Sequence, residues 1–434
     1  MTAPYTLRDY QEEGVRFARE RCGTLFAVDL GLGKTAMAIA ASEAPIAVVC
    51  PASAIPVWEE ELALWGLSSQ VLRGGKPHPA RLEQVDAYII TYQSAKWITL
   101  FSRINRRSVR TVILDEAHYL QKKGLKWTQQ VKTVGADRVL LLTATPIRNR
   151  LRSFYSLLDT ANPRAWGYFH EFRERYCGAV QGEWGLVDTG PTHIEELQQR
   201  LTETAFVQNW GDPRLAGLRP ELRRHVIDTR PGRKDRARIV EEAVGGLGKQ
   251  YTVGASLVLV DSLRQKIGLG KVPPAMPIIQ DLYEKHKRIV VWFWYKKTLD
   301  AFKAALPLGI PVDVVTGSTT AAKRERITRE WKHGDPEDPR LLLATEASFS
   351  AAVSLTTAEA EVFLEFSYSP LDLQQAEKRV HRPGSPFDEV HAYYVRASQT
   401  VEDRILNVLL DKVGEVEEVF GREPQTLQIV EVAE

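Results

Sequence analysis

The chain has 434 residues, 44% of them hydrophobic and 26% charged, which is an ordinary globular composition with enough length for two or three compact domains. Its 57 basic and 55 acidic residues nearly cancel, so the chain is not a bulk polycation, and a nucleic-acid site would have to be a local groove. The polar N-terminus does not indicate a signal peptide, and the lack of any run of 18 apolar residues does not indicate a membrane span. The three scattered cysteines do not indicate a disulfide framework.

The first third of the chain alternates short apolar or β-branched runs with helical stretches. This pattern, from Thr24 to about Leu158, predicts a parallel sheet covered by helices. The expected strands are residues 24–28, 46–50, 87–91, 111–114 and 138–142. Ligands of open α/β sheets bind beyond the carboxyl ends of the strands, so the residues that follow these runs are the candidates for a site.

A glycine-rich loop follows the first expected strand. Gly31-Leu32-Gly33-Lys34-Thr35 opens an alanine-rich helical segment, which is the strand, loop and helix order of a Walker A phosphate loop. In such a loop Lys34 reaches the β- and γ-phosphates of ATP and Thr35 ligates Mg²⁺. The usual first glycine of the motif is Val28 here, so a plain glycine-rich turn stays open as an alternative.

Two adjacent carboxylates follow the fourth expected strand. Asp115-Glu116-Ala117-His118 is a DEAH box, in which Asp115 is expected to hold Mg²⁺ and Glu116 to orient and deprotonate the attacking water. The alternative is a solvated acidic turn. Together with Lys34, the pair predicts an ATP-hydrolysing site.

The middle of the chain changes character, and a second alternating region follows it. Residues 160–270 carry aromatic helical patterns, the turn Trp210-Gly211-Asp212-Pro213 and a basic run near 230–238, which we interpret as a mainly helical insertion. A second parallel sheet is expected from residues 288–293, 312–315, 340–344, 361–365 and 390–395.

Several further motifs occur in one order along the chain. In the first half they are Leu7-Arg8-Asp9-Tyr10-Gln11, Val49-Cys50-Pro51 with Trp58, Ile90-Thr91-Tyr92, and Leu142-Thr143-Ala144-Thr145-Pro146 with Asn149. In the second half they are Gly317-Ser318-Thr319 with Arg324, Val353-Ser354-Leu355-Thr356, and Gln374-Gln375-Ala376-Glu377-Lys378-Arg379-Val380-His381-Arg382. The set resembles superfamily-two helicases of the Swi/Snf type, closest in look to small HARP-like annealing helicases and their phage or bacterial relatives.

The resemblance implies an α/β fold of two RecA-like parallel-sheet lobes in tandem. Lobe 1 would span residues 1–158, a helical insertion and linker 159–270, lobe 2 residues 271–420, and an acidic tail 421–434. Gly268, Gly270 and Lys271 resemble the family's short linker, and we expect a flexible hinge there.

The resemblance also implies roles for individual residues. It assigns Gln11, with Arg8, to the adenine base, and Arg379 and Arg382 to arginine fingers that enter the ATP site when the lobes close. Arginine suits that role because it keeps its charge, and residues three apart on a helix share a face. A solvated basic helix face is the alternative for this segment. The nucleotide-binding set is therefore Arg8, Gln11, Gly31, Leu32, Gly33, Lys34, Thr35 and Ala36, with Thr35 and Asp115 on Mg²⁺.

A motor on nucleic acid needs hydroxyl, amide and basic groups aimed at phosphates, with weak sequence preference. The candidates are Pro51, Thr91, Thr143, Thr145, Gly317, Ser318, Thr345 and Thr356, with basic help from Arg106, Arg107, Arg148 and Arg150. Each hydroxyl is equally compatible with a local capping role. No two of the nine histidines share metal-ligand spacing on one helix, so we expect no histidine metal site.

The expected function is that of a DNA-stimulated ATPase that translocates on double-stranded or branched DNA, with ATP and Mg²⁺ as cofactors. It would be a monomeric motor, aided by accessory targeting proteins, in the cytoplasm of a prokaryotic or phage-infected cell. Two alternatives stay open: an RNA or single-strand helicase with the same core, and a non-hydrolysing DNA-binding scaffold.

Overall fold

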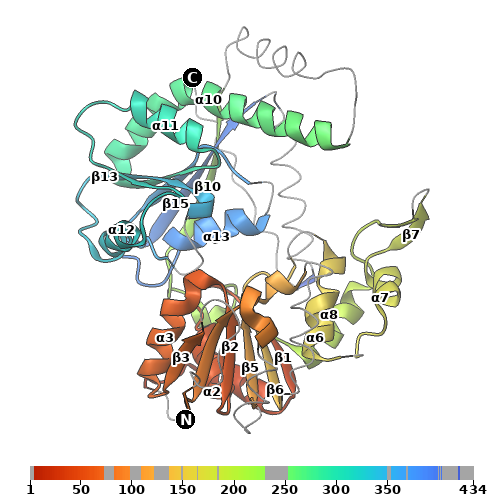
Figure 1. Cartoon of the computed structure of the whole chain (residues 1–434). Helices are drawn as coiled ribbons and strands as arrows, with labels where there is room; N and C mark the ends of the chain where they lie inside the picture. The colour runs from red at the N-terminus through yellow and green to blue at the C-terminus, as the bar shows by residue number, and fades with distance from the viewer. Residues whose placement is uncertain are drawn as a thin grey trace. The chain divides into compact units, whose positions relative to one another are not determined.

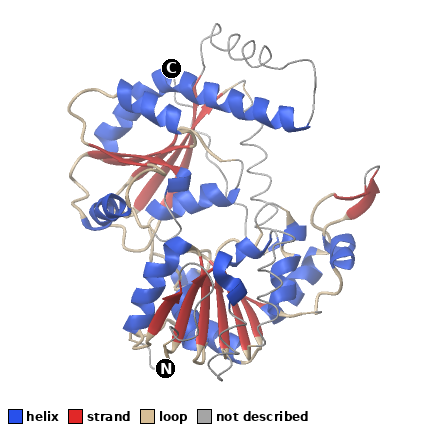
Figure 2. Ribbon diagram, viewed as in Figure 1, coloured by secondary structure: helices blue, strands red, loops and turns tan. Residues whose placement is uncertain are grey.

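The computed structural model divides into two compact units. It describes residues 4–72, 83–97, 109–121, 136–147, 150–163, 165–182, 185–229, 253–348, 353–367, 370–398, 400, 402 and 419–420. The first unit comprises Met1–Ala216 and Gly414–Pro424, and the second comprises Gly217–Val413 and Gln425–Glu434. Each unit contains one large sheet with helices on its faces (Figures 1 and 2).

The first unit is built on a seven-stranded parallel sheet in the order β3-β4-β2-β5-β6-β1-β9. Its strands are β1 (Gly23–Val28), β2 (Ile46–Cys50), β3 (Ser69–Leu72), β4 (Ala87–Thr91), β5 (Thr111–Asp115), β6 (Arg138–Thr143) and β9 (Ala205–Gln208). The five strands expected from sequence are confirmed. All five residues of β2 are buried, as expected for a central strand covered on both faces.

The helices of this unit are α1 (Asp9–Arg19), α2 (Lys34–Ala41), α3 (Ile55–Leu64), α6 (Tyr155–Ala161), α7 (Phe169–Tyr176) and α8 (Ile194–Thr204). A separate antiparallel hairpin joins β7 (Ala179–Gly182) and β8 (Gly185–Asp188). The 3₁₀ turns within the described ranges are η1 (Ala52–Ala54), η3 (Tyr92–Trp97), η4 (Ala117–Gln121), η5 (Leu151–Ser153), η6 (Pro213–Leu215) and η7 (Glu346–Ser348).

The second unit is built on a six-stranded parallel sheet in the order β10-β15-β14-β11-β13-β12. Its strands are β10 (Glu221–Thr229), β11 (Arg288–Phe293), β12 (Val312–Val315), β13 (Arg340–Thr345), β14 (Ala360–Phe363) and β15 (Glu389–Ala397), and its helices are α10 (Val253–His286), α11 (Lys296–Ala305), α12 (Ala321–His333) and α13 (Pro370–Val380). Along β11, Val290 and Trp292 join one apolar core, and Ile289, Val291 and Phe293 join the other. Successive side chains of β11 therefore point to opposite faces of the sheet and contribute to the apolar core on each face.

The stretch expected to be a mainly helical insertion, residues 159–270, also contributes strands to both sheets. The stretch contains α7, α8 and part of α10, but also the edge strands β9 and β10, which complete the first and second sheets respectively. The two compact units divide between these strands, after Ala216. The segment therefore contributes to both sheets.

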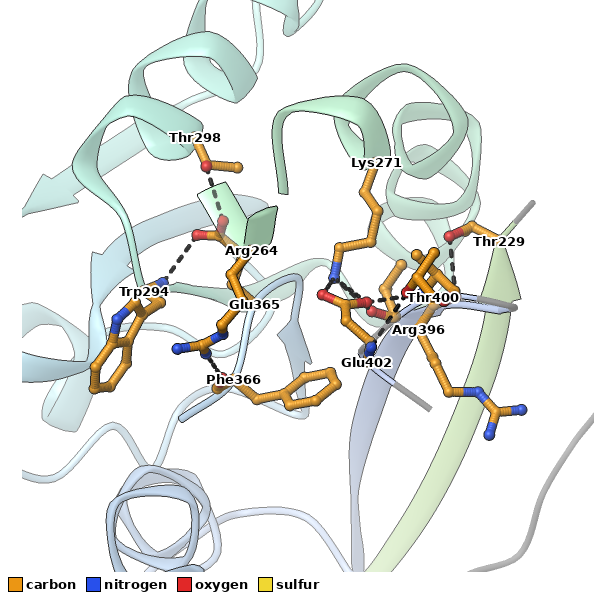
Figure 3. A network of polar contacts seen from close by, with 12 residues as sticks. Thr229, Arg264, Lys271, Trp294, Thr298, Glu365, Phe366, Arg396, Thr400 and Glu402 are labelled. Carbon is orange, nitrogen blue, oxygen red and sulfur yellow. Dashed lines mark hydrogen bonds and ion pairs between the residues drawn. The ribbon is translucent and has the colours of Figure 1, made fainter. Parts of the chain in front are cut away.

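The expected hinge at Gly268, Gly270 and Lys271 is corrected, because all three residues lie inside α10. Gly268 packs tightly: a Cβ atom there would lie 1.8 Å from Glu365 Oε1. The Lys271 side chain is fully buried and donates to Glu402 Oε1 at 2.7 Å and to the Val395 carbonyl at 3.0 Å (Figure 3). These residues fix α10 to the second sheet.

Replacing Lys271 by Met is expected to destabilise the protein by about 3–5 kcal/mol, because it leaves Glu402 as an unpaired buried carboxylate. Denaturant unfolding of the full chain measures the effect. The exposed Lys285 of the same helix provides the control, since Lys285→Met removes a solvated charge. Equal stabilities of the two variants would contradict a structural role for Lys271.

The chain returns to the first unit near its C-terminus. Val419 is 1% exposed within the apolar core of the first unit, and the Phe420 ring lies 5.8 Å from that of Phe154. The acidic tail expected over 421–434 lies outside the described residues. Within the described residues, no helix has the length and apolar character needed to cross a membrane.

Candidate nucleotide site

The glycine-rich loop adopts a backbone that glycine makes accessible. Gly31 and Gly33 have φ angles of +84° and +77°, in the left-handed region, and α2 begins at Lys34 directly after them. Val28, which replaces the usual first glycine, is the buried last residue of β1. The turn thus brings the N-terminus of α2 to the carboxyl edge of the sheet, where helix N–H groups favour an anion.

Lys34 extends back across the start of this loop. Its Nζ donates to the carbonyls of Val28 at 2.8 Å and Asp29 at 3.2 Å. Thr35 and Ala36 follow it in the first turn of α2. The ammonium group therefore lies beside the loop that is expected to hold phosphates.

The predicted base-reading element packs against the same loop. Gln11 Nε2 and the Tyr10 hydroxyl both donate to the Leu32 carbonyl, at 3.2 and 3.1 Å. A Cβ on Gly33 would lie 2.2 Å from Gln11 Nε2, so this glycine also makes room for the amide. Arg8, just before α1, is exposed. The structure brings Gln11 to the phosphate loop, and contact of Arg8 and Gln11 with the base stays a prediction.

The acidic pair lies at the same edge of the sheet. Asp115 is the last residue of β5, Glu116 follows it, and β6 lies between β5 and β1. Asp115 Oδ2 accepts from Trp58 Nε1 at 2.9 Å, and Asp115 Oδ1 accepts from the backbone N–H of Glu116 at 2.9 Å. The Tyr92 hydroxyl donates to the Asp115 carbonyl at 2.7 Å. These contacts give Trp58 and Tyr92, which the sequence placed in neighbouring motifs, a common role in holding Asp115.

The electrostatics of the pair suit a divalent cation. Burial and the adjacent charge of Glu116 raise the pKa of Asp115, and Trp58 and the nearby positive charge of Lys34 act against that rise. Two adjacent carboxylates, the partly exposed Asp115 and the buried Glu116, carry excess negative charge, and Mg²⁺ prefers oxygen ligands of this kind. The donor set therefore fits Mg²⁺ at Asp115, and Thr35 stays its predicted second ligand.

Glu116 has an unusual backbone for its residue type. Its φ angle is +50°, a left-handed conformation that costs a non-glycine residue about 1–3 kcal/mol and is concentrated at functional sites. Its Oε2 lies 3.2 Å from His118 Nδ1, and the His118 ring stacks on Tyr119 with centroids 4.8 Å apart. The left-handed backbone sets the direction in which the Glu116 side chain leaves the chain, and the contact with His118 holds its carboxylate.

A segment that no motif indicated also supports the loop. The backbone N–H of Asp29 donates to the Gln208 carbonyl at 3.0 Å, at the end of β9. Trp210 then donates twice: its backbone N–H to Asp29 Oδ2 at 3.2 Å, and its Nε1 to the Leu30 carbonyl at 3.1 Å. The pairing of β9 with β1 brings Trp210 here from 180 residues away in the chain.

In the second unit, the motif around α13 contacts the motif at 353–356. Arg382 Nη1 donates to Ser354 Oγ at 2.6 Å and to the Val353 carbonyl at 3.3 Å, and the backbone N–H of Leu355 donates to the Arg379 carbonyl at 2.8 Å. Arg382 is partly exposed, and burial lowers its pKa to about 10, which leaves it a cation at neutral pH. Arg379 is buried, and its charge acts on Glu361 of the same unit.

Arg224 on β10 anchors this helix. Its Nε and Nη2 donate to Glu377 Oε1 at 2.6 Å and Oε2 at 2.9 Å. His381 is held in turn, since its Nε2 lies 2.9 Å from the Pro220 carbonyl. The edge strand therefore sets the position of the two candidate arginine fingers.

The candidate nucleic-acid residues fall into two groups by exposure. Thr143, Thr145, Thr345 and Thr356 are buried, whereas Pro51, Thr91, Gly317 and Ser318 have exposed surface. Thr143 Oγ1 accepts from the backbone N–H of Thr145 at 3.1 Å, the local turn role that was the alternative. Nucleic-acid contact stays a prediction for all eight. Arg106, Arg107, Arg148 and Asn149 lie outside the described residues.

Comparisons with known proteins agree with this arrangement. A model described as the SNF2-related domain matches residues 10–205, and the helicase conserved C-terminal domain matches residues 274–384. The first parallel-sheet unit is thus similar to the SNF2-related domain, and most of the second is similar to the helicase conserved C-terminal domain.

Two relatives have names that refer to chromatin or DNA. The chain is 28% identical over 432 residues to the SWI/SNF-related matrix-associated actin-dependent regulator of chromatin subfamily A-like protein 1 of Xenopus tropicalis, covering 94% of this chain and 44% of that protein. It is 24% identical over 451 residues to the DNA annealing helicase and endonuclease ZRANB3 of Bos taurus, covering 98% and 41%. The chain thus spans less than half the length of these relatives.

A solved structure, the Sulfolobus solfataricus SWI2/SNF2 ATPase core in complex with dsDNA, is also similar. It shares 20% identity, with 93% of this chain and 91% of that chain covered, at a TM-score of 0.46.

Proposed function

We propose that this chain hydrolyses ATP in response to DNA and uses the energy to translocate on double-stranded or branched DNA. The observation that carries the proposal is the convergence of the phosphate loop and the Asp115-Glu116 pair at one sheet edge, with the charge of Lys34 acting on Asp115. The match of residues 10–205 to the SNF2-related domain supports it. One relative is named a DNA annealing helicase and endonuclease, which supports strand annealing or branch migration as the outcome.

In this proposal the first unit performs the hydrolytic chemistry. The N-terminus of α2 and Lys34 hold the phosphates, and Thr35 and Asp115 hold Mg²⁺, which supplies charge neutralisation to the phosphoryl group. Glu116 accepts a proton from the water that attacks the γ-phosphorus, and the bond to the β–γ bridging oxygen breaks as ADP leaves. The strained backbone of Glu116 and its contact with His118 support a positioned base.

The second unit supplies the arginine in this proposal. Arg382 is the better candidate finger, because it is partly exposed whereas Arg379 is buried. Arg379 supports it from within the second unit. The finger role requires the two units to close around ATP, which is part of the proposal.

We assign the DNA surface to the exposed candidates at the strand ends. Pro51 follows β2, and Thr91 is the last residue of the neighbouring strand β4 in the first sheet. Gly317 and Ser318 follow β12 of the second sheet. Such hydroxyl and backbone groups contact phosphates without reading bases, so we expect weak sequence preference. The proposed motor acts as a monomer, and accessory proteins would direct it to its DNA.

The test is the dependence of ATP turnover on nucleic-acid structure. With duplexes, forks, single-stranded DNA and RNA of matched length, we expect the largest stimulation from duplex or forked DNA. Phosphate release at saturating ATP, repeated over a salt series, measures it, and stimulation should fall with salt because phosphate contacts carry the binding.

Each other outcome favours a named alternative. Strong preference for RNA or single strands would replace the proposal with a helicase acting on those substrates. DNA binding without hydrolysis under any condition would indicate a scaffold that keeps the fold.

A further inference from the structure

Three side chains with metal-binding atoms converge in the second unit, and none of them belongs to a motif of the nucleotide site. They are His286, the last residue of α10; Glu359, just before β14; and His391, on β15. One ligand atom from each lies within 4.8 Å of the other two, and His286 Nδ1 lies 3.1 Å from Glu359 Oε2.

Strand register brings these residues together. Ala360 pairs with His391 in the β14–β15 ladder and with Ile289 in the β14–β11 ladder. Lys287, with a φ angle of +56°, turns the chain directly from the end of α10 into β11. His286 and Glu359 therefore arrive side by side at the amino ends of β11 and β14.

A second set of contacts orients both histidine rings. The Tyr393 hydroxyl lies 3.0 Å from His286 Nε2, and His225 Nε2 lies 3.1 Å from His391 Nδ1. Metal-binding histidines usually use their second ring nitrogen in this way, which fixes the tautomer and the ring plane. When His286 donates its Nε2–H to Tyr393, its Nδ1 lone pair faces the Glu359 carboxylate.

We propose that His286, Glu359 and His391 form a structural binding site for a divalent transition metal, with Zn²⁺ as the best match. Two imidazoles and one carboxylate are a common zinc donor set, and a water molecule would complete a tetrahedron. Ligand atoms about 2.0–2.1 Å from zinc lie roughly 3.4 Å apart in that geometry. The 3.1 Å pair already fits, and the remaining atoms need to approach by about 1.4 Å at most, given the 4.8 Å limit.

One further observation agrees with this site. The cluster lies at the amino ends of the strands, whereas Thr345 ends β13 and Ser318 follows the carboxyl end of β12. The metal would thus join α10 to β14 and β15, and its role does not depend on the proposed function.

The experiment uses the full chain without a histidine tag and in a Cys22→Ser background, because the exposed Cys22 thiol is a competing zinc ligand. After treatment with a chelator and its removal, the protein is titrated with ZnCl₂ in the absence of nucleotide. We expect one bound zinc per chain and a higher unfolding temperature, and CoCl₂ should give the visible absorption of a tetrahedral nitrogen and oxygen site.

Two variants remove single ligands, and one serves as control. Glu359→Gln and His391→Ala should each weaken zinc binding by at least about 10-fold, the lower end of what even a supporting residue contributes. His333→Ala changes an exposed histidine at the end of α12 and should bind zinc as the parent does. Glu359 is partly exposed and Gln is isosteric, so Glu359→Gln remains informative if His391→Ala misfolds.

Absence of zinc binding by the parent would overturn the site. Equal affinity of the parent and the Glu359→Gln variant would also overturn it, and would leave the cluster as a hydrogen-bonded network that holds α10 on the sheet.

Discussion

Replacing Glu116 by Gln is expected to lower ATP turnover by about 10²- to 10⁴-fold, the usual contribution of a general base. Gln keeps the size and the hydrogen-bonding atoms of Glu but cannot accept the proton of the attacking water at neutral pH. ATP affinity should stay within a few-fold, since the groups expected to hold the phosphates, Lys34 and the N-terminus of α2, are unchanged. Turnover with saturating duplex DNA and nucleotide binding by calorimetry measure the two effects separately.

Lys34→Ala is the comparison for this variant. It removes the ammonium from the phosphate loop, so hydrolysis and ATP binding should be lost together. Normal turnover in the Glu116→Gln variant would remove Glu116 from the chemistry. Loss of ATP binding in that variant would show that Glu116 holds the nucleotide site together instead.

Replacing Arg382 by Ala is expected to reduce DNA-stimulated turnover by roughly 10³-fold or more, because arginine fingers elsewhere contribute 10³–10⁵. Nucleotide affinity should change by no more than a few-fold, since the fingers act mainly on the charge of the transferring phosphoryl group. Arg382→Lys keeps the charge but loses the planar donor fork, so it should recover only part of the rate. Turnover at saturating ATP and DNA provides the measurement.

A structural role of Arg382 within the second unit would look different. Arg382 donates to Ser354, so its loss could act by loosening the 353–356 segment. Ser354→Ala removes that acceptor while keeping the arginine, and Arg329→Ala removes an exposed arginine of α12 as a control. Similar rate losses in Arg382→Ala and Ser354→Ala, with equal losses of stability, would contradict the finger assignment.

The sequence predicted the central strands well, because their apolar runs are buried on both faces. Of the edge strands, β12 was predicted, but β3, β9 and β10 were missed. In β10, the half that begins at Glu221 is rich in charged residues, among them Arg223 and Arg224, and its pairing with β15 depends on residues about 170 positions away. β9 is only four residues long and directly follows α8. Local patterns contain little of this information.

The sequence predicted those parts of the candidate site whose residues form short motifs directly after a strand. Lys34 and the Asp115-Glu116 pair follow strands in recognisable spacings, so their placement at one sheet edge could be inferred. Trp210 reaches the loop only through the pairing of β9 with β1, which no local spacing reveals. Its contacts to Asp29 and Leu30 therefore appear only in the structure.

Glycine and histidine were misleading for a different reason. Gly268 was interpreted as a hinge from its flexibility, yet it is required by close packing against Glu365 within a helix. The histidines lack ligand spacing along the sequence, but His286, Glu359 and His391 come from three elements and meet through the register of one sheet. Spacing rules detect ligands on one element and overlook this kind of cluster.

The left-handed backbone at Glu116 affects attempts to raise the thermal stability of the protein. Glycine or asparagine suits φ of +50° better than glutamate does, so selection for heat resistance alone should favour either residue at this position. In our proposal a variant with Gly or Asn at position 116 would be inactive, because it lacks the carboxylate. A substitution that stabilises the protein at this position would therefore remove its activity, and a thermostabilising library should keep glutamate at position 116.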